Sequence, residues 1–202
     1  MLTAVRRIGA GRLAAAVALV LVCVGFAVPA RAQALPEEAG AERTVRMFDL
    51  FCFALLPDLE TIGEIAGEHF EELTGTELDR YQPQVPAEEL RAWRFVDFEQ
   101  EYVLTTARAT PDEQFRSENP EFAESTSYAC SLVLPAQDAP DDVRAEMVAL
   151  MEREPDDTWE EGTLKANEWS GQTEQMMVNV AHYGSVDDKP GGLLSSIAFV
   201  LP

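Results

Sequence analysis

The chain has 202 residues, of which 15 are basic and 36 acidic, and its net charge at pH 7 is −21. Nucleic acid and anionic membrane surfaces repel such a chain, so we expect neither as a partner. The length suffices for one domain with a proper core. The P-loop, dinucleotide-binding, C-x-x-C and zinc-finger patterns are missing from the sequence, so we expect no cofactor.

The first 32 residues have the parts of a secretory signal peptide. Three arginines and no acid lead into an apolar run over 13–28, which is shorter than the roughly 20 residues that span a bilayer. Ala30 and Ala32 then form the A-x-A pattern at which signal peptidase cuts. We expect cleavage after Ala32, no membrane span after cleavage, and a mature protein that is periplasmic or secreted.

Cleavage makes the chain more acidic. It removes four of the 15 basic residues and no acid, so 11 basic residues face 36 acidic ones and the net charge becomes −25. The only lysines of the sequence are Lys165 and Lys189, and the acids are spread along the chain. This pattern is typical of a solvated acidic surface.

The start of the mature chain predicts two helices. Apolar residues at helical spacing form the first helix, and Pro57 ends it. Either Asp58 or Thr61 can cap the second helix, which we expect to end at Gly75. The apolar stripe of the first helix consists of Val45, Phe48, Cys52 and Leu55.

The middle of the chain predicts three strands. Residues 93–98 and 102–108 are rich in aromatic and β-branched side chains and are expected to form a hairpin. The polar segment 111–124 contains two prolines and is predicted to be a mobile excursion. A third strand around Cys130 follows, and Pro135 closes it.

The last third predicts one helix and three strands. Pro140 opens the helix, and acids in the first turn suit the helix dipole. An acidic loop is predicted over 155–161. Residues 164–169 and 175–183 are expected to pair as a hairpin around 170–172, with 193–201 as the last strand.

The predicted elements follow the order ααβββαβββ. Because short turns join neighbouring strands, they favour an antiparallel sheet. We therefore predict an α+β fold, a largely antiparallel sheet of about six strands with the helices packed on one face. The signal peptide at 1–32 and a flexible leader at 33–41 precede this single domain, which spans 42–202.

Cys52 and Cys130 are the two cysteines that remain after cleavage. In an oxidising compartment, an even cysteine count predicts a disulfide. Cys52 falls on the apolar stripe of the first helix and Cys130 on one face of the third strand. A bridge between them therefore requires that helix to pack on that strand.

The sequence has two histidines, His69 and His182. His69 falls on the apolar side of the second helix and is interpreted as a core or boundary residue. His182 and Tyr183 end a strand, where side chains reach the rim of a sheet, although alternation puts them on opposite faces. They are the candidate catalytic residues, but no G-x-S-x-G turn accompanies the nearby serines.

Acidic residues surround Trp159. No D-x-D-x-D-G calcium pattern is present, so the cluster is interpreted first as solvated charge and second as a metal site. Trp159 is expected in an exposed, mobile loop, where it can anchor a partner or a sugar. Trp93 and Trp169 are expected in the core. The candidate metal ligands are Asp156, Asp157, Glu160 and Glu161.

A good core, one disulfide and no reactive constellation favour a non-enzymatic binding domain. Its partner is an unidentified protein or small molecule, bound on the sheet face and the loops beside it. The alternative is a small periplasmic or secreted hydrolase that uses His182 with Tyr183 or a nearby carboxylate. A cleft in which His182 meets a nucleophile within hydrogen-bond reach would favour the hydrolase.

Overall fold

The computed structural model describes residues 39–202 apart from 84–86, 188 and 190. The predicted signal peptide at 1–32 and residues 33–38 of the predicted leader lie outside this part of the chain. Ala41 already belongs to the first helix. Within the described residues we find no helix with both the length and the apolar character needed to cross a membrane.

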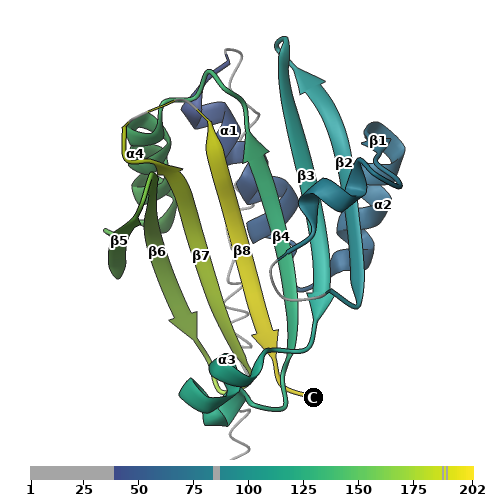
Figure 1. Ribbon diagram of the computed structural model, residues 1–202, viewed down its shortest axis with the longest axis vertical. Coiled ribbons are helices and arrows are strands. Elements are labelled where there is room, and N and C mark those ends of the chain that lie inside the picture. The colour runs from purple at the N-terminus through teal and green to yellow at the C-terminus, as the bar shows by residue number, and fades with distance from the viewer. Residues whose placement is uncertain (1–38, 84–86, 188, 190) are drawn as a thin grey trace, which may run out of the picture. The chain divides into compact units, whose positions relative to one another are not determined.

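Eight strands in the described part of the chain form one antiparallel sheet (Figure 1). They are β1 (Glu71–Glu72), β2 (Glu89–Asp97), β3 (Gln100–Ala109), β4 (Thr126–Leu134), β5 (Asp157–Glu161), β6 (Leu164–Gln172), β7 (Met176–Ser185) and β8 (Gly192–Val200). Their order across the sheet is β1-β2-β3-β4-β8-β7-β6-β5, so two meanders meet where β4 pairs with β8. The α+β class is as predicted. The sequence predicts the six longest strands but not β1 and β5, which lie at the two edges.

The described residues also form four α-helices, one π-helix and two 3-10 helices. They are α1 (Ala41–Phe48), the π-helix η1 (Asp49–Phe53), α2 (Leu59–His69), η2 (Leu78–Tyr81), α3 (Glu113–Glu118), η3 (Pro120–Phe122) and α4 (Pro140–Met151). Helices α1, α2 and α4 cover one side of the sheet, which we call the helix face (Figure 1). Of these, α1 packs on α4 and continues as η1, which lies against β4 and β8, while α2 lies against β2 and β3. Helix α3 lies on the opposite side, the open face, so the helices are not all on one face as predicted.

Side chains alternate between the two faces along each strand. Those on the helix face are mostly large and form the core with the helices. They include Trp93, Leu104, Leu132, Trp169, Val180 and Leu194, all fully buried. Those in the centre of the open face are smaller and only half-buried, and include Ala107, Ala129, Ser131, Asn179 and Ile197. The two tryptophans predicted to be core residues are therefore in the core.

A disulfide joins Cys52 of η1 to Cys130 of β4, as predicted. Their Cα atoms lie 5.2 Å apart, and both residues are fully buried. The bridge ties the first helical segment to the middle of the sheet across a sequence separation of 78 residues. Such a bond is compatible with an exported protein, because the cytosol keeps most thiols reduced.

Helix α2 begins at the first of the two caps that the sequence allows. The carboxylate of Asp58 accepts bonds from the Thr61 amide at 3.0 Å and from the Thr61 hydroxyl at 2.7 Å. The helix ends at His69 and not at the predicted Gly75, because Glu71–Glu72 pair with β2 as β1. The side chain of His69 is exposed, so its predicted place on the apolar side of the helix was wrong.

The segment 111–124 holds α3 and η3 instead of the predicted excursion. Asp112 caps α3 by accepting a bond from the Phe115 amide at 2.7 Å. The ring of Phe115 stacks on Phe199 of β8, with centroids 3.9 Å apart, and Phe122 is fully buried. The polar composition of this segment predicted a loop, because its apolar residues are few and widely spaced.

The acidic segment 155–161 also differs from its prediction. Most of it is the edge strand β5, in which Trp159 pairs with Ala166 of β6. The neighbouring hairpin turns at 173–175 and not at 170–172, because the latter residues continue the ladder between β6 and β7. Pairing between β6 and β7 thus extends both strands beyond the residues that the sequence predicted for them.

Candidate functional site

His182 and Tyr183 are consecutive in β7 and face opposite sides of the sheet. The His182 side chain faces the helices and is 1% exposed. Within the described residues, neither of its ring nitrogens has a hydrogen-bond partner. Burial, with the positive charge of Arg144 adding to it, lowers the pKa of His182 to about 4. The imidazole is therefore neutral at pH 7.

Tyr183 lies half-buried on the open face. Its ring meets the edge of the Trp159 ring, with centroids 6.3 Å apart. Burial raises the pKa of its hydroxyl, and the negative charge of Glu168 adds to this shift. Because the sheet separates His182 from Tyr183, the structure does not bring this pair to one substrate.

The serines near His182 do not complete a hydrolytic site. Ser195 points to the open face, where its hydroxyl lies 2.9 Å from that of Ser131. Ser196 shares the helix face with His182, but its hydroxyl is buried and has no partner in the described part of the chain. Ser185 accepts a bond from the Asp187 amide at 3.3 Å.

A pocket of about 510 Å³ lies on the open face, where β6, β7 and β8 meet their turns. We call it the Tyr183 pocket. Four of its side chains share the open face, namely Leu164, Tyr183, Ser185 and Leu193. The turns supply the remaining wall, formed by Thr163, Gly184, Lys189, Gly191 and Gly192. The strand ends that line the pocket, the starts of β6 and β8 and the end of β7, lie at the end of the sheet remote from α3 (Figure 1).

Glycine at the start of β8 gives the pocket its wall. A Cβ added at Gly192, where φ is +149°, would lie 2.3 Å from the carbonyl oxygen of Tyr183. Only glycine therefore lets the start of β8 lie this close to the end of β7. Gly191 precedes it with a φ of +99°, and its amide donates to the Asp138 carbonyl at 3.0 Å.

The pocket combines apolar surface with one positive charge. Leu164, Leu193 and the Tyr183 ring are apolar, while the Lys189 ammonium is 73% exposed and 3.6 Å from an Asp187 oxygen. An ion pair this exposed is worth little, so the ammonium remains able to meet another anion. The Tyr183 hydroxyl adds a hydrogen-bond donor. The pocket can thus hold an apolar body that carries one anionic group.

The predicted metal ligands do not converge. Asp156 accepts bonds from Arg153 at 2.5 Å and from the Ser170 amide at 2.7 Å, and the bond from Ser170 is the main reason that its pKa is lowered. Alternation in β5 puts Asp157 and Glu161 on one face and Glu160 on the other. Across the described residues, no three His, Cys, Asp or Glu side chains are placed to hold a metal ion.

Trp159 is half-buried in β5 and does not lie in the exposed loop that was predicted. Its indole nitrogen donates to Glu168 at 2.8 Å. Its ring meets Tyr183, which lines the pocket. Trp159 therefore supports the pocket from the neighbouring strand and is not among the residues that line it.

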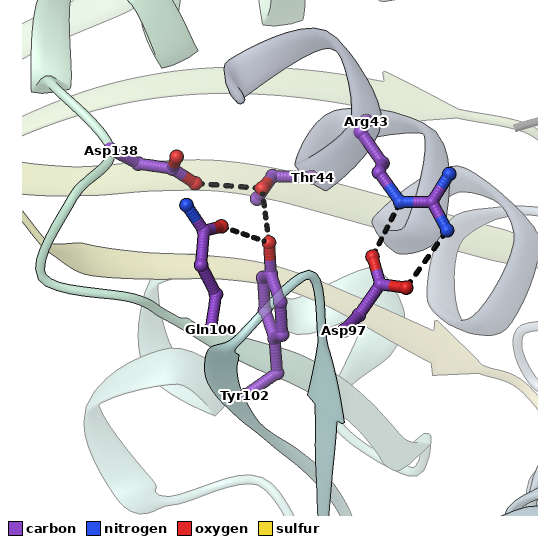
Figure 2. Close-up of polar contacts among 6 residues, drawn as sticks. All are labelled: Arg43, Thr44, Asp97, Gln100, Tyr102 and Asp138. Carbon is purple, nitrogen blue, oxygen red and sulfur yellow. Dashed lines mark hydrogen bonds and ion pairs between the residues drawn. The ribbon is translucent and has the colours of Figure 1, made fainter. Parts of the chain in front are cut away.

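Four buried polar side chains are joined by hydrogen bonds that were not predicted from the sequence (Figure 2). We call them the buried polar chain. The hydroxyl of Thr44 lies 2.6 Å from an Asp138 carboxyl oxygen and 3.0 Å from the Tyr102 hydroxyl. Tyr102 in turn donates to the side-chain oxygen of Gln100 at 2.8 Å. All four side chains are buried, and Arg43 forms an ion pair with Asp97 beside them. Residue spacing could not predict these contacts, because the hydrogen bonds join three segments that are far apart in the sequence.

No protein-family model matches the chain, and no curated protein or solved structure matches it.

Proposed function

We propose that the mature chain is an exported, non-enzymatic binding domain that holds a small ligand in the Tyr183 pocket. The ligand has an apolar body and one anionic group. The pocket carries this proposal, because it places apolar side chains of three strands, a hydroxyl and an ammonium around one space on the open face. Hydrolysis has less support, because His182 and Tyr183 face opposite sides of the sheet.

Apolar contact dominates the expected affinity. Burying about 100 Å² of apolar ligand surface contributes roughly 2.5 kcal/mol, at about 25 cal/mol per Å². An exposed ion pair with Lys189 adds about 0.2 to 1 kcal/mol. The rest of the mature chain is strongly acidic and repels anions at long range. We therefore expect Lys189 to select for a single anionic group and the apolar wall to supply most of the binding energy.

Anilinonaphthalene sulfonate is a suitable probe, since it has an aromatic body and one sulfonate. We expect wild-type protein to bind it at one site, with Lys189→Gln weakening binding by about twofold to fivefold. Ser185→Phe should fill the pocket and abolish most of the binding. Fluorescence titration and calorimetry measure both effects.

Lys165→Gln is the matched control. Lys165 is the other lysine of the chain, and strand alternation places it on the helix face of β6. Its substitution should leave binding of the probe unchanged. Equal losses for the two lysine variants, or undiminished binding by Ser185→Phe, would reject the Tyr183 pocket as the site.

Export rests on the predicted signal peptide, and the disulfide is compatible with it. N-terminal sequencing of the exported protein tests this part separately. We expect the mature chain to begin at Gln33. A protein that still begins at Met1 would contradict the predicted cleavage.

A further inference from the structure

The buried polar chain of Figure 2 contains too few hydroxyl hydrogens for its contacts. Three links join Asp138 to Thr44, Thr44 to Tyr102, and Tyr102 to Gln100. Thr44 and Tyr102 supply one hydroxyl hydrogen each. With the side-chain oxygen of Gln100 facing Tyr102, one link lacks a hydrogen if Asp138 is ionised. A neutral Asp138 supplies the third hydrogen.

We propose that Asp138 is a buried, neutral carboxylic acid whose ionisation releases the turn that borders the Tyr183 pocket. In the neutral state Asp138 donates to Thr44, Thr44 donates to Tyr102, and Tyr102 donates to Gln100. Loss of the proton leaves a buried negative charge, turns the Thr44 hydroxyl toward it, and breaks the link between Thr44 and Tyr102. This inference deepens the proposed function and rests on it for its effect on ligand binding.

The surroundings of Asp138 favour the neutral acid. The residue is 3% exposed, and burial is the main cause that raises its pKa, with repulsion from Asp142 of α4 adding to it and the bond to Thr44 opposing it. On the other side, Arg43 of α1 and Asp97 of β2 are paired with each other. Burial also raises the pKa of Tyr102, which therefore stays a neutral donor. Asp187 and Lys189 of the β7–β8 turn form a second ion pair, whose two charges cancel as those of Arg43 and Asp97 do.

The backbone of Asp138 connects the buried polar chain to the Tyr183 pocket. Its carbonyl accepts the amide of Gly191 at 3.0 Å, and Gly191 lines the pocket. Its own amide donates to the Pro135 carbonyl at 3.2 Å, and this bond holds the turn between β4 and α4. If the charged side chain moves toward water, the carbonyl that holds Gly191 moves with it. Ionisation should then loosen the turn that carries Lys189.

The first test needs no ligand. Carbon NMR titration of the Asp138 carboxyl and hydrogen exchange of the Gly191 amide are followed as the pH rises. We expect Asp138 to ionise at a higher pH than an ordinary aspartic acid, and Gly191 exchange, corrected for its intrinsic rate, to rise several-fold over the same range. Asp138→Asn should keep Gly191 protected throughout, because the amide can still donate to Thr44.

Two further variants keep the test decisive. Asp141→Asn changes an exposed acid in the first turn of α4, next to Asp142, and should leave the Gly191 profile unchanged. Asp142→Asn removes a charge that repels an ionised Asp138, so the Gly191 profile should shift to lower pH. This second variant serves even if Asp138→Asn fails to fold. Ionisation of Asp138 together with the exposed acids, as a turned Gln100 amide would allow, overturns the proposal, as does an Asp142→Asn profile without the shift.

The ligand measurement separates this inference from the proposed function. Binding of anilinonaphthalene sulfonate by the wild type should weaken several-fold as Asp138 ionises, and binding by Asp138→Asn should not. If the probe fails to bind at any pH while Gly191 and Asp138 respond as expected, the proposed function fails and the proton-controlled turn stands. If the probe binds with one pH profile in both proteins, the control of binding by Asp138 is rejected.

Discussion

The two faces of the sheet differ in what their residues do. The helix face holds the tryptophan core, the disulfide and His182, whose ring nitrogens have no hydrogen-bond partner among the described residues. The open face holds small, half-buried side chains and the Tyr183 pocket. Residues next to each other in β7 therefore have opposite environments. We infer that stability depends mainly on the helix face, because the buried cluster of Leu73, Ala92 and Val103 on the open face is much smaller than the core under the helices.

The largest expected effect is on the helix face. Trp169 is fully buried, and its indole nitrogen donates to the Arg153 carbonyl at 3.1 Å. Trp169→Ala should lower the free energy of unfolding by about 3 to 5 kcal/mol, because it leaves a cavity in the core. Chemical denaturation measures this loss. A loss under about 1 kcal/mol would show that the core is not where the structure puts it.

Removal of the disulfide should have the next largest effect. Cys130→Ser frees the unfolded chain from its long closed loop and puts a hydroxyl into a fully buried site. We expect a loss of roughly 2 to 5 kcal/mol in the free energy of unfolding. Titration of thiols in the native wild type is the companion measurement. Two reactive thiols in that protein would contradict the bond.

His182 should make stability depend on pH. Its pKa is about 4 in the folded chain, against 6.5 for an ordinary histidine. Between these values the unfolded chain binds a proton that the folded chain does not, so stability is present above pH 6.5 and is lost as the pH falls toward 4. The shift corresponds to about 3 kcal/mol.

The comparison of His182→Leu with the wild type isolates this effect from the many acids. Urea denaturation from pH 7 to pH 4 should show the smaller loss for the variant. His69→Leu, at an exposed position, is the matched control and should follow the wild type. Parallel curves for all three proteins would mean that His182 is accessible to protons in the folded state.

The smallest effect is expected at the edge of the open face. Trp159→Phe keeps a ring beside Tyr183 but removes the bond to Glu168, so we expect the free energy of unfolding to fall by about 0.5 to 1.5 kcal/mol in chemical denaturation.

Millimolar calcium should not raise the melting temperature more than simple salt does, because the nearby carboxylates do not converge. A specific increase with calcium would restore the metal hypothesis.

Local signals explain which parts of the fold were predictable. Pro57, Asp58 and Pro140 marked helix ends because their effects act within one turn. The edge strand β5 was missed, since acidic residues resemble a loop until a neighbouring strand pairs with them. Helix α3 was missed because its one stacked aromatic ring, Phe115, finds its partner about eighty residues later in the chain.

The candidate site was only partly predictable for the same reason. Tyr183 was named from its place at the end of a strand, and it does line the pocket. Its pairing with His182 was only a candidate, because alternation along the strand already put the two side chains on opposite faces. Gly191, Gly192 and Lys189 gave no signal beyond a turn, because their role depends on a strand approaching from elsewhere.

By itself, the sequence determined the period of the six long strands, the pair of cysteines and the opposite directions of His182 and Tyr183. These follow from backbone geometry and covalent chemistry, which act between near neighbours or need only a count. Tertiary structure alone decided which face the helices cover, and so which of the two residues is buried. It also gathered Thr44, Tyr102 and Asp138 into one buried chain, because hydrogen bonds between distant segments form only once the sheet and helices have packed.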